Sequence, residues 1–348
     1  MGGLVAAVER AWSPRTGPER ALRALLVPAS AVYGAAVAVR NALYDAGWLP
    51  ATRVPARVLS VGNLTVGGTG KTPTALWLAQ ALVRRGRRVA IVARGYGKRR
   101  RGVVIVGAAG VPLVSPEDGG DEAVMLARRF HGPVVTAERR VDAAAEACAR
   151  FGVDTLVLDD GFQHRALARD ADLVLVADDP AARRLLPAGS RREPLAALER
   201  SRAALAVADV EPQWPALPPG VARFRGHLRP DVLVRVVEER WREESADGLA
   251  GTAVVAVTGV ARPERFHATL ERCGAQVVRR LVFPDHHAYG AADVGAIAEA
   301  SRDGLVVTTE KDLVKLAGRP GLAALRALRV VLEVDDGDRL VDLLLAGS

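Results

Sequence analysis

The sequence has little cysteine, few aromatic residues and no uninterrupted apolar stretch of the roughly 20 residues that a membrane-spanning helix needs. Its two cysteines, Cys148 and Cys273, are far apart and lack the spacing of a metal site, so we expect a protein of a reducing compartment. The first residues also lack the basic start, the compact apolar run and the small-residue cleavage site of a signal peptide. These absences argue against a disulfide-stabilised secreted protein.

The sequence has no recognisable nucleic-acid-binding motif, although it is strongly basic. The formal net charge of its 348 residues is +8, and the isoelectric point is about 10.1. Nine arginines and lysines fall between residues 84 and 101, with no acidic residue among them. Such a cluster suits an anionic membrane surface or a phosphorylated substrate, or it is an ordinary solvated face. Without an accompanying motif, we expect no nucleic-acid partner.

What is present is the composition of a folded protein with two domains, because hydrophobic residues make up 49% and charged residues 25%. From residue 51 onward, short apolar runs alternate with helical patterns. This predicts an α/β fold of the P-loop NTPase type, a mostly parallel sheet with helices on both faces. We predict an amino-terminal segment, a larger P-loop domain, a linker with extended strands and a smaller carboxy-terminal α/β domain, over residues 1–50, 51–209, 210–244 and 245–348.

Residues 1–50 differ in character from the rest of the chain. Ala24–Val39 holds sixteen uncharged residues between flanking arginines. Nearby aromatic residues, Tyr33, Tyr44 and Trp48, suit an amphipathic segment that lies in a membrane interface. A helix pair packed on the following domain fits this stretch about equally well.

The stretch from Val58 to Thr74 has the order of a phosphate-binding loop: an apolar strand, a glycine-rich turn and a helix. The glycines allow backbone N–H groups to surround phosphate oxygens, Lys71 can reach the β and γ phosphates, and the Thr72 hydroxyl can bind Mg²⁺. The full Walker A pattern has a glycine where this sequence has Thr65, so a glycine-rich turn without a ligand is the alternative. The predicted nucleotide-binding residues are Thr65, Gly67, Gly68, Thr69, Gly70, Lys71 and Thr72.

Two adjacent carboxylates, Asp159 and Asp160, follow the apolar strand predicted at 155–158. An acidic residue at the carboxyl end of such a strand is the Walker B arrangement, in which it holds Mg²⁺ directly or through water. Neighbouring carboxylates repel each other unless a cation lies between them, which favours a metal role. An ordinary Asp-Asp-Gly turn is the alternative, and the division of roles between the two residues is open.

Asp121 follows two glycines, just before a helix predicted at 122–130. Its carboxylate can cap that helix or accept a proton from an attacking hydroxyl, and the residue pattern alone favours the cap. His286 and His287 follow another predicted strand, and no third metal ligand is indicated nearby. Polar residues also gather in Thr308–Asp312 at a strand end, where open α/β sheets place ligands.

Seven motifs, in this order, resemble the tetraacyldisaccharide 4′-kinase family, the lipid A 4′-kinases of Gram-negative bacteria. The resemblance spans most of the chain, and the first and fourth motifs together are highly specific. Thr65 is normal for this family, whereas Arg191 stands where an apolar residue is expected. The motifs are GNLTVGGTGKTP (62–73), RGYG (94–97), GDE (120–122), DDGFQH (159–164), LPAG with REP (186–189 and 192–194), FPDHH (283–287) and TTEKD (308–312).

This resemblance implies an ATP- and Mg²⁺-dependent lipid kinase of lipid A biosynthesis, with residues 51–209 as its kinase domain. It implies transfer of the γ-phosphate of ATP to the 4′-hydroxyl of tetraacyldisaccharide 1-phosphate, at the cytoplasmic face of the inner membrane. The implied partners are the acylated substrate and the membrane surface, and no obligate protein partner is expected.

The resemblance also implies roles for individual residues. Lys71 and Thr72 serve the phosphates and Mg²⁺, and Asp159 and Asp160 serve the metal. Asp121 is the base, paired with a histidine of the other predicted domain, so that domain closure assembles the site. His286 is preferred over His287 as that histidine. The residues implied to contact the substrate or the transferred phosphoryl group are His164, Arg192 and His287.

Three other functions compete with this interpretation. Another P-loop small-molecule kinase or ligase would keep the nucleotide site but need no membrane-facing segment. A nucleotide switch of the membrane-associated partitioning ATPase type has a second lysine just before the glycine pair, where this sequence has Val66. A non-catalytic lipid-binding scaffold leaves the phosphate loop and the acidic strand end without a purpose.

Overall fold

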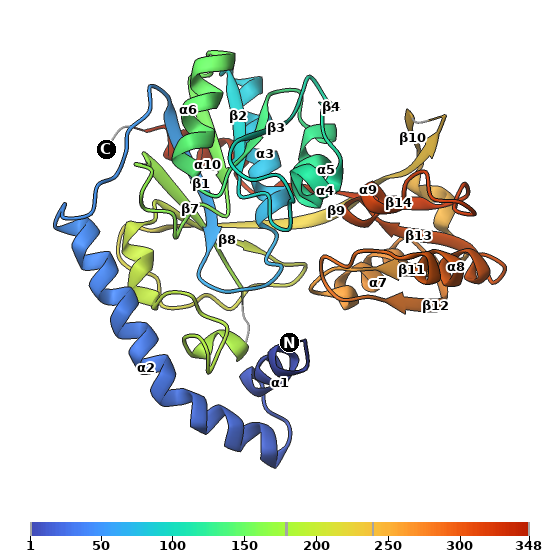
Figure 1. The fold of residues 1–348 in the computed structure, drawn as a ribbon, viewed down its shortest axis with the longest axis horizontal. Coiled ribbons are helices and arrows are strands. Elements are labelled where there is room, and N and C mark those ends of the chain that lie inside the picture. Colours follow the sequence, from blue (N-terminus) through green and yellow to red (C-terminus); the bar gives the residue numbers. More distant parts are fainter. Residues whose placement is uncertain (1, 178–179, 239, 347–348) are drawn as a thin grey trace. The chain divides into compact units, whose positions relative to one another are not determined.

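The computed structural model describes residues 2–177, 180–238 and 240–346, which form two compact units (Figure 1). Both units are assembled from separate stretches of the chain. The first comprises Met1–Val92, Arg140–His227 and Val334–Ser348, and the second comprises Ala93–Arg139 and Leu228–Glu333.

This division differs from the expected domain boundaries: residues 1–50 belong to the first unit, and the predicted linker 210–244 is divided between the units after His227. Residues 93–139 belong with the later part of the chain and not with the phosphate loop, and the last residues, from Val334, belong with the first unit. Helix α5 (Asp121–Arg129) packs against α9 (Glu310–Leu316), and α10 (Gly337–Leu345) packs against α3 (Lys71–Arg84). Helix packing between distant segments therefore decides which residues share a core.

The first unit is built on a parallel sheet. Its strands are β1 (Arg57–Asn63), β2 (Val89–Ala93), β6 (Thr155–Asp159), β7 (Ala171–Val176), β8 (Ala203–Val207) and the beginning of β9 (Ala222–Val237). Its other elements are α1 (Gly2–Trp12), α2 (Gly17–Asp45), α3, α6 (Arg140–Phe151), α10 and the 3₁₀ turns Pro180–Arg183 and Leu195–Arg200. The strand order is β9-β8-β7-β1-β6-β2, and neighbouring strands run parallel. Val58–Asn63 of β1 is buried throughout, as expected of a central strand covered on both faces. The predicted mostly parallel α/β fold is confirmed.

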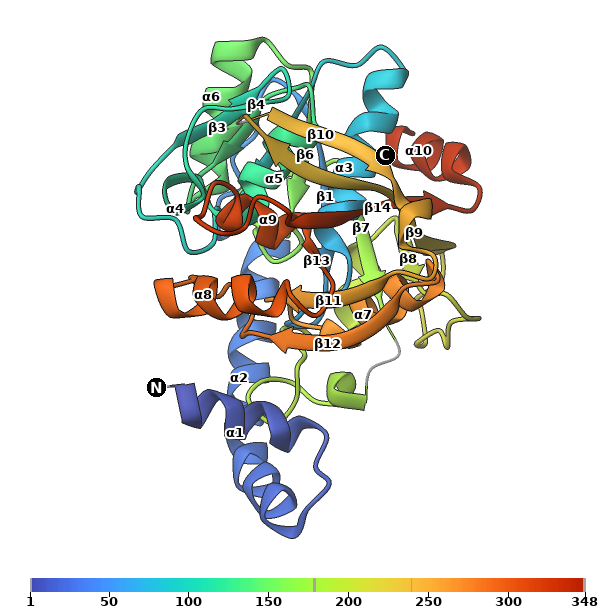
Figure 2. The same cartoon turned by 90° about the vertical axis from the view of Figure 1, so that its right-hand side faces the viewer.

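The second unit contains a smaller parallel sheet and an antiparallel part. The parallel strands lie in the order β12-β11-β13-β14, which can be followed in Figure 2. The elements are β3 (Val104–Ala108), β4 (Val111–Pro112), α4 (Pro116–Gly119), α5, β5 (Val134–Thr136), the end of β9, β10 (Arg240–Ser245), the 3₁₀ turn Ala246–Leu249, β11 (Ala253–Thr258), α7 (Pro263–Arg272), β12 (Gln276–Val282), α8 (Ala291–Ala300), β13 (Leu305–Thr309), α9 and β14 (Arg326–Val334). Within it, β3 pairs antiparallel with β4 and β5, and β10 pairs antiparallel with β9.

Alternate residues of β11 belong to two separate hydrophobic clusters. Val255 and Val257 pack with Ile297 of α8, whereas Val254 and Ala256 belong to the cluster that contains residues of α7. Because successive strand residues point to opposite faces, each face of this sheet is covered by its own helix. The second unit therefore has a core of its own.

Helix α9 follows β13 directly and is not indicated by the sequence pattern. The Thr309 hydroxyl accepts a hydrogen bond from the backbone N–H of Asp312, which caps the helix at its first turn. The predicted polar strand end is thus the start of a short helix. That helix turns its polar residues toward α5.

The long helix α2 packs on the rest of the first unit, which is one of the two alternatives that the sequence left open. Polar side chains attach it to the first unit: Ser30 Oγ donates to Leu185 O at 2.9 Å, and Asn41 Nδ2 donates to Glu193 Oε2 at 2.8 Å. Its other residues leave an exposed apolar surface, and only 11% of its most apolar 18-residue window is buried. By length and composition alone, this 29-residue helix could cross a membrane.

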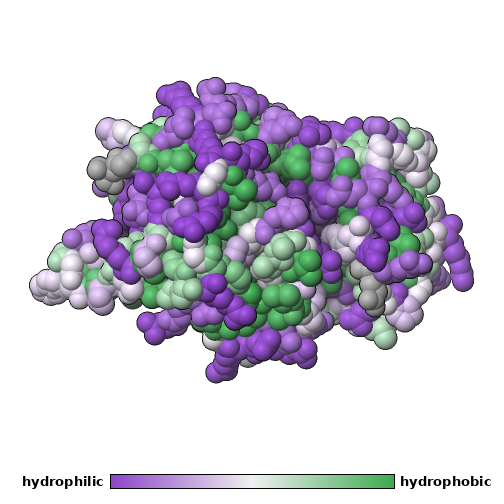
Figure 3. Space-filling view, turned by 90° about the horizontal axis from the view of Figure 1, so that it is seen from above, coloured by the Kyte–Doolittle hydropathy of each residue, from purple (hydrophilic) through white to green (hydrophobic). Residues whose placement is uncertain are grey.

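The surface is mostly hydrophilic on the side shown in Figure 3, with smaller hydrophobic areas between the charged residues. The basic cluster at residues 84–101 is partly neutralised by acidic residues that are distant in sequence. The pairs are Arg85 with Asp338 at 2.9 Å, Arg88 with Asp154 at 3.3 Å, and Lys98 with Glu138 at 3.6 Å. The excess positive charge that the sequence shows locally is therefore smaller on the folded surface.

Candidate active-site residues

The predicted nucleotide-binding residues lie in the loop between β1 and α3 and in the first turn of α3. Gly67 and Gly70 have φ angles of 104° and 92°, which L side chains rarely adopt. Helix α3 begins at Lys71, so its first N–H groups are at the loop, where they can bind an anion. The Lys71 ammonium lies 3.4 Å from the Gly67 carbonyl oxygen.

Asn63, at the end of β1, holds the loop in place. Its Nδ2 donates to Thr69 Oγ1 at 2.8 Å and approaches Thr65 Oγ1 at 3.4 Å. Asn63 is fully buried, and its amide also meets the side chain of Arg192. Sequence reasoning included Asn63 in a motif but assigned it no role.

Thr72 and Asp159 meet where α3 begins and β6 ends. Thr72 Oγ1 donates to Asp159 Oδ2 at 2.9 Å, and Asp159 is 5% exposed. A hydroxyl and a carboxylate supply oxygen ligands of the kind that Mg²⁺ prefers, and here the two groups are adjacent. Within residues 2–177, 180–238 and 240–346 no group of three or more His, Cys, Asp or Glu is placed to hold a metal. A P-loop magnesium site needs no such group, because phosphate oxygens and water complete it.

Asp160 faces two cations. Arg192 donates to both of its carboxylate oxygens, at 3.0 and 2.7 Å, and Lys71 Nζ lies 3.9 Å away. Burial opposes the charged form of Asp160, but the hydrogen bonds and charge of Arg192 outweigh it and lower the pKa of the carboxyl group. The backbone of Asp160 is left-handed, with φ 54°, a conformation that is uncommon outside glycine and frequent at functional sites.

His164 lies beside the start of α6. Its Nε2 accepts a hydrogen bond from the backbone N–H of Arg140 at 3.2 Å. Arg140 is 5% exposed, and its charge contributes to the lowered pKa of Asp160. Sequence reasoning assigned Arg140 no role, although a basic residue at the start of a helix that follows a strand end is a signal that could have found it.

Asp121 and His286 come together in the second unit, although 165 residues separate them. Nδ1 of His286 lies 3.2 and 3.1 Å from the two oxygens of Asp121. The expectation that Asp121 caps its helix is wrong: it is the first residue of α5, and Gly120, with φ 92°, occupies the cap position. The expectation that the two residues come from different domains is also wrong, because packing of α5 on α9 places both in one unit.

The charges around this pair keep the carboxylate ionised. Burial acts to raise the pKa of Asp121, but the hydrogen bond from His286, with the charges of Lys311, His286 and Lys315, lowers it to about 2. The hydrogen bond to Asp121 in turn raises the pKa of His286, against burial and the charge of Lys311. The polar segment Thr308–Asp312 that the sequence indicates contains Lys311, to which no role was assigned, and Lys315 lies outside it.

His287 points to a different set of neighbours. Its Nε2 lies 2.9 Å from Asp293 Oδ2, and its ring stacks on Phe283 and meets Tyr289 edge-on. These contacts anchor the loop that carries His286, so the structure pairs His286, and not His287, with Asp121.

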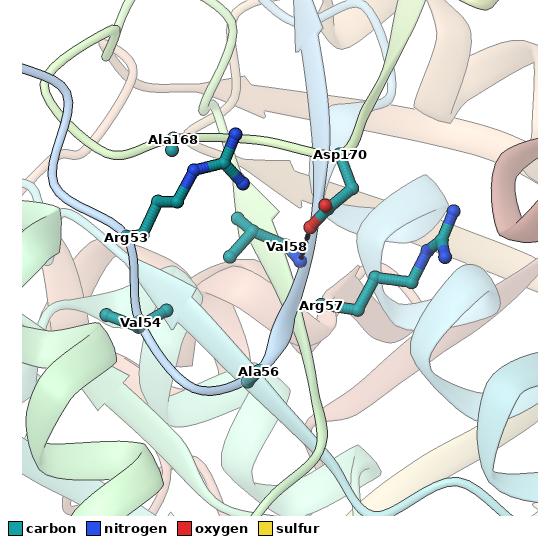
Figure 4. Close-up of a pocket in the computed structure, with 7 residues that line it drawn as sticks. All are labelled: Arg53, Val54, Ala56, Arg57, Val58, Ala168 and Asp170. Atoms are coloured by element: carbon teal, nitrogen blue, oxygen red, sulfur yellow. Dashed lines mark hydrogen bonds between the residues drawn. The ribbon is translucent and has the colours of Figure 1, made fainter. Parts of the chain in front are cut away.

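Two cavities lie near these elements. One of about 160 Å³ is in the second unit and is lined by both members of the Asp121–His286 pair, Tyr96, Tyr289 and Lys315, among others. The other, of about 290 Å³, lies beside Arg53, Arg57 and Asp170, and Figure 4 shows the Asp170 carboxylate directed at the backbone nitrogen of Val58. It is at the amino end of β1, whereas the phosphate loop follows the carboxyl end. Only the first cavity contains predicted site residues.

A glycine-rich loop, a helix amino terminus and a threonine–aspartate contact at the carboxyl ends of a parallel sheet define a P-loop nucleotide-binding protein. The sequence model of one family, the tetraacyldisaccharide-1-P 4′-kinases, matches residues 22–347. The chain therefore belongs to the tetraacyldisaccharide-1-P 4′-kinase family, as its motifs predict.

Individual relatives agree with this assignment. The chain is 44% identical to the tetraacyldisaccharide 4′-kinase of Anaeromyxobacter dehalogenans (strain 2CP-C), over 96% of this chain and 93% of that protein. It is 39% identical to that of Koribacter versatilis (strain Ellin345), over 90% of this chain and 96% of the relative. A crystal structure of LpxK from Aquifex aeolicus in complex with ATP matches with a TM-score of 0.80 and 34% identity, over 93% of this chain and 98% of that one.

Proposed function

We propose that the protein is an ATP-dependent kinase that transfers the γ-phosphate to the 4′-hydroxyl of tetraacyldisaccharide 1-phosphate in lipid A biosynthesis. The observation that carries this proposal is the hydrogen bond of Thr72 to Asp159, which joins the phosphate loop to the acidic strand end. The names of the relatives support the acceptor, and the ATP in the related crystal structure supports the donor.

The first unit supplies the nucleotide-binding residues in this proposal. The loop from Thr65 to Gly70 and the first turn of α3 bind the phosphates, and Lys71 exchanges its contact with the Gly67 carbonyl for phosphate oxygens. Thr72 and Asp159 would hold Mg²⁺, which when bound neutralises charge on the phosphates.

Asp160 and Arg192 form the second part of the nucleotide site. The carboxylate of Asp160 holds the planar guanidinium of Arg192 through two hydrogen bonds, which fixes its orientation. An oriented arginine stabilises the charge that develops on a transferred phosphoryl group. We therefore propose that Arg192 contacts that group and that Asp160 positions Arg192, with His164 and Arg140 completing this region.

The second unit supplies the group that activates the acceptor. A carboxylate with a pKa of about 2 is ionised at any physiological pH, so Asp121 can always accept a hydrogen bond from the sugar hydroxyl. The transition state of phosphoryl transfer is loose, and the hydroxyl keeps its proton until late, so a strong base is not needed. The proton moves to Asp121 as the new P–O bond forms and is released after the reaction. Such a base contributes about 10²–10⁴-fold to the rate.

In this proposal, the exposed apolar surface of α2 brings the protein to the membrane that holds the acylated substrate. Leu25, Val32 and Val39 are 78%, 72% and 60% exposed. Apolar residues on one surface of a helix partition into the acyl boundary of a bilayer, where the acyl chains of the substrate also lie. We propose that the protein works at the cytoplasmic face of the inner membrane, with α2 in the interface.

The reaction is tested by transfer of ³²P from γ-labelled ATP to detergent-dispersed tetraacyldisaccharide 1-phosphate in the presence of Mg²⁺. We expect labelled lipid with the wild type and with the control Asp118→Asn, which changes an acidic residue three positions from Asp121. We expect Asp121→Asn to lose about 10²–10⁴-fold in transfer and to bind ATP as the wild type does. ATP binding without label on the lipid in the wild type would show that the acceptor is wrong.

The membrane surface is tested separately by flotation with vesicles that contain anionic phospholipid. Val32→Asp places a charge on the exposed apolar surface of α2, and Val210→Asp places one at an equally exposed valine elsewhere, 73% against 72%. We expect only Val32→Asp to reduce the floating fraction. Equal flotation of the two variants would refute a role for α2.

A further inference from the structure

Helix α9 places two lysines beside the Asp121–His286 pair, one for each member. Lys311 Nζ lies 3.3 Å from Nε2 of His286, on the side of the ring away from Asp121. One turn further along the helix, Lys315 Nζ lies 3.4 Å from Asp121 Oδ2. Both side chains are largely buried, 12% and 13% exposed, so both ammonium groups have fixed surroundings.

The hydrogen-bonding capacities of these groups determine the protonation of the ring. A lysine ammonium has three donors and no acceptor, so Nε2 of His286 must accept from Lys311. Nδ1 faces the ionised carboxylate of Asp121 and must therefore donate. The ring that satisfies both contacts is the neutral imidazole with its proton on Nδ1. A proton on Nε2 would face the ammonium at 3.3 Å, whereas Asp285 Oδ2, the carboxylate oxygen on that side, is farther away at 3.8 Å.

Lys311 is held at this position as a cation. Its Nζ lies 2.8 Å from Asp285 Oδ1 and 3.2 Å from Glu122 Oε1. Burial acts to lower the pKa of Lys311, but the charges of Glu122, Asp121 and Asp285 outweigh it and raise the pKa above its ordinary value. Lys311 is therefore charged wherever the enzyme is folded, and it cannot accept a proton from the ring.

We infer that Lys311 is a positioning residue, which acts through its hydrogen bond to Nε2, opposes protonation of His286 and directs the Nδ1–H of the ring at Asp121. This role rests on the proposed function of Asp121 as the base. A neutral imidazole orients the carboxylate, whereas an imidazolium would also neutralise much of its charge and weaken it as a proton acceptor. The lysine opposes the two carboxylates near the ring, Asp121 and Asp285, which favour the protonated form.

The charged groups that face the ring determine whether a substitution raises or lowers the pH at which His286 titrates. They are Asp121 from α5, Asp285 from its own loop, Lys311 from α9 and the Tyr96 ring, whose centroid lies 4.8 Å away. Lys311 is the cation among them that contacts the ring. Removing its charge must favour protonation of His286, so the pH at which the ring titrates must rise.

The test is a pH titration of the His286 ring by ¹H–¹⁵N NMR in the full-length protein, assigned with His286→Gln. In the wild type we expect the Nδ1–H tautomer at high pH. We expect Lys311→Met to raise the titration midpoint by about one pH unit and Lys311→Arg, which keeps the charge, to restore it. Lys315→Met removes a charge on the same helix that contacts Asp121, and we expect it to move the midpoint by less than half as much.

The inference is overturned if Lys311→Met leaves the midpoint unchanged, or if Lys315→Met moves it as far. A merely structural role for Lys311 would lower the folded fraction without moving the midpoint of the folded protein. In the lipid kinase assay, the acidic limb of the kcat profile should move with the NMR midpoint, with KM for ATP unchanged. If the wild type labels no lipid, the proposed function fails, while the NMR titration still decides the role of Lys311.

Discussion

Glu310 is a buried carboxylate between two arginines, and we predict that its neutralisation strongly destabilises the second unit. It is 4% exposed, and its oxygens lie 3.1 Å from Arg129 Nη1 and 2.8 Å from Arg329 Nε. Arg129 belongs to α5, Arg329 to β14 and Glu310 to α9. The ion triad thus joins the helix that carries Asp121 to the helix that carries the two lysines.

The size of the effect follows from the burial of the arginines, which are 10% and 15% exposed. Glu310→Gln preserves the shape of the side chain but leaves both guanidinium groups without this counter-charge. Removing one partner of a buried ion pair costs about 3–5 kcal/mol. Arg329 retains an ion pair with Glu243, so we expect the lower end, about 3 kcal/mol. For a unit of this size that corresponds to a fall of roughly 6–12 °C in melting temperature.

The measurement is urea and thermal unfolding followed by circular dichroism. The matched control is Glu271→Gln on α7, whose partner Arg280 lies 2.9 Å away, with both side chains about half exposed. An exposed pair of this kind contributes about 0–1 kcal/mol, so the control should change little. Equal stability of the two variants would refute the reasoning that burial makes the Glu310 triad important.

Three further predictions concern the pair and the phosphate loop. The pKa of Asp121 is about 2, below the ordinary value of 3.8, so the wild type should be more stable than Asp121→Asn by about 2 kcal/mol above pH 4. This difference in stability should disappear as the pH falls toward 2. A difference that stays constant in acid unfolding would contradict the prediction. Asp159→Asn should raise the Mg²⁺ concentration for half-maximal label transfer by about 10- to 100-fold, and an unchanged Mg²⁺ titration would remove Asp159 from the metal site. Gly70→Ala should cost about 1–2 kcal/mol in urea unfolding, because φ is 92° while the nearest atom to an added Cβ is 3.7 Å away. Gly17→Ala, at a glycine of the same unit without a positive φ and with open space around an added Cβ, should cost less, and equal losses would refute the conformational cause.

The order of strand, glycine-rich loop and helix was legible in the sequence because every part of it is local. Val58 to Thr74 form one continuous segment, and the special backbone at Gly67 and Gly70 needs only the residues that are there. The same holds for the apolar runs that became parallel strands, and for the motifs that identify the family. Burial on both faces of a parallel sheet leaves a signal in consecutive residues.

Contacts between distant segments could not be predicted in the same way. The sequence paired Asp159 and Asp160 as metal ligands because they are neighbours, yet the structure directs one at Thr72 and the other at Arg192. Which carboxylate meets which partner depends on the left-handed backbone at Asp160 and on the loop that brings Arg192 to this residue.

By itself, then, the sequence determined the fold class, the family, the phosphate loop and the candidate residues for the nucleotide and for the acceptor hydroxyl. Only the tertiary structure decided that Asp121 shares a unit with His286, and that Lys311 lies on the other side of that ring. The physical reason is that helix packing and strand order bring together residues that no local pattern connects. The pKa and the partner of an ionisable side chain depend on that packing.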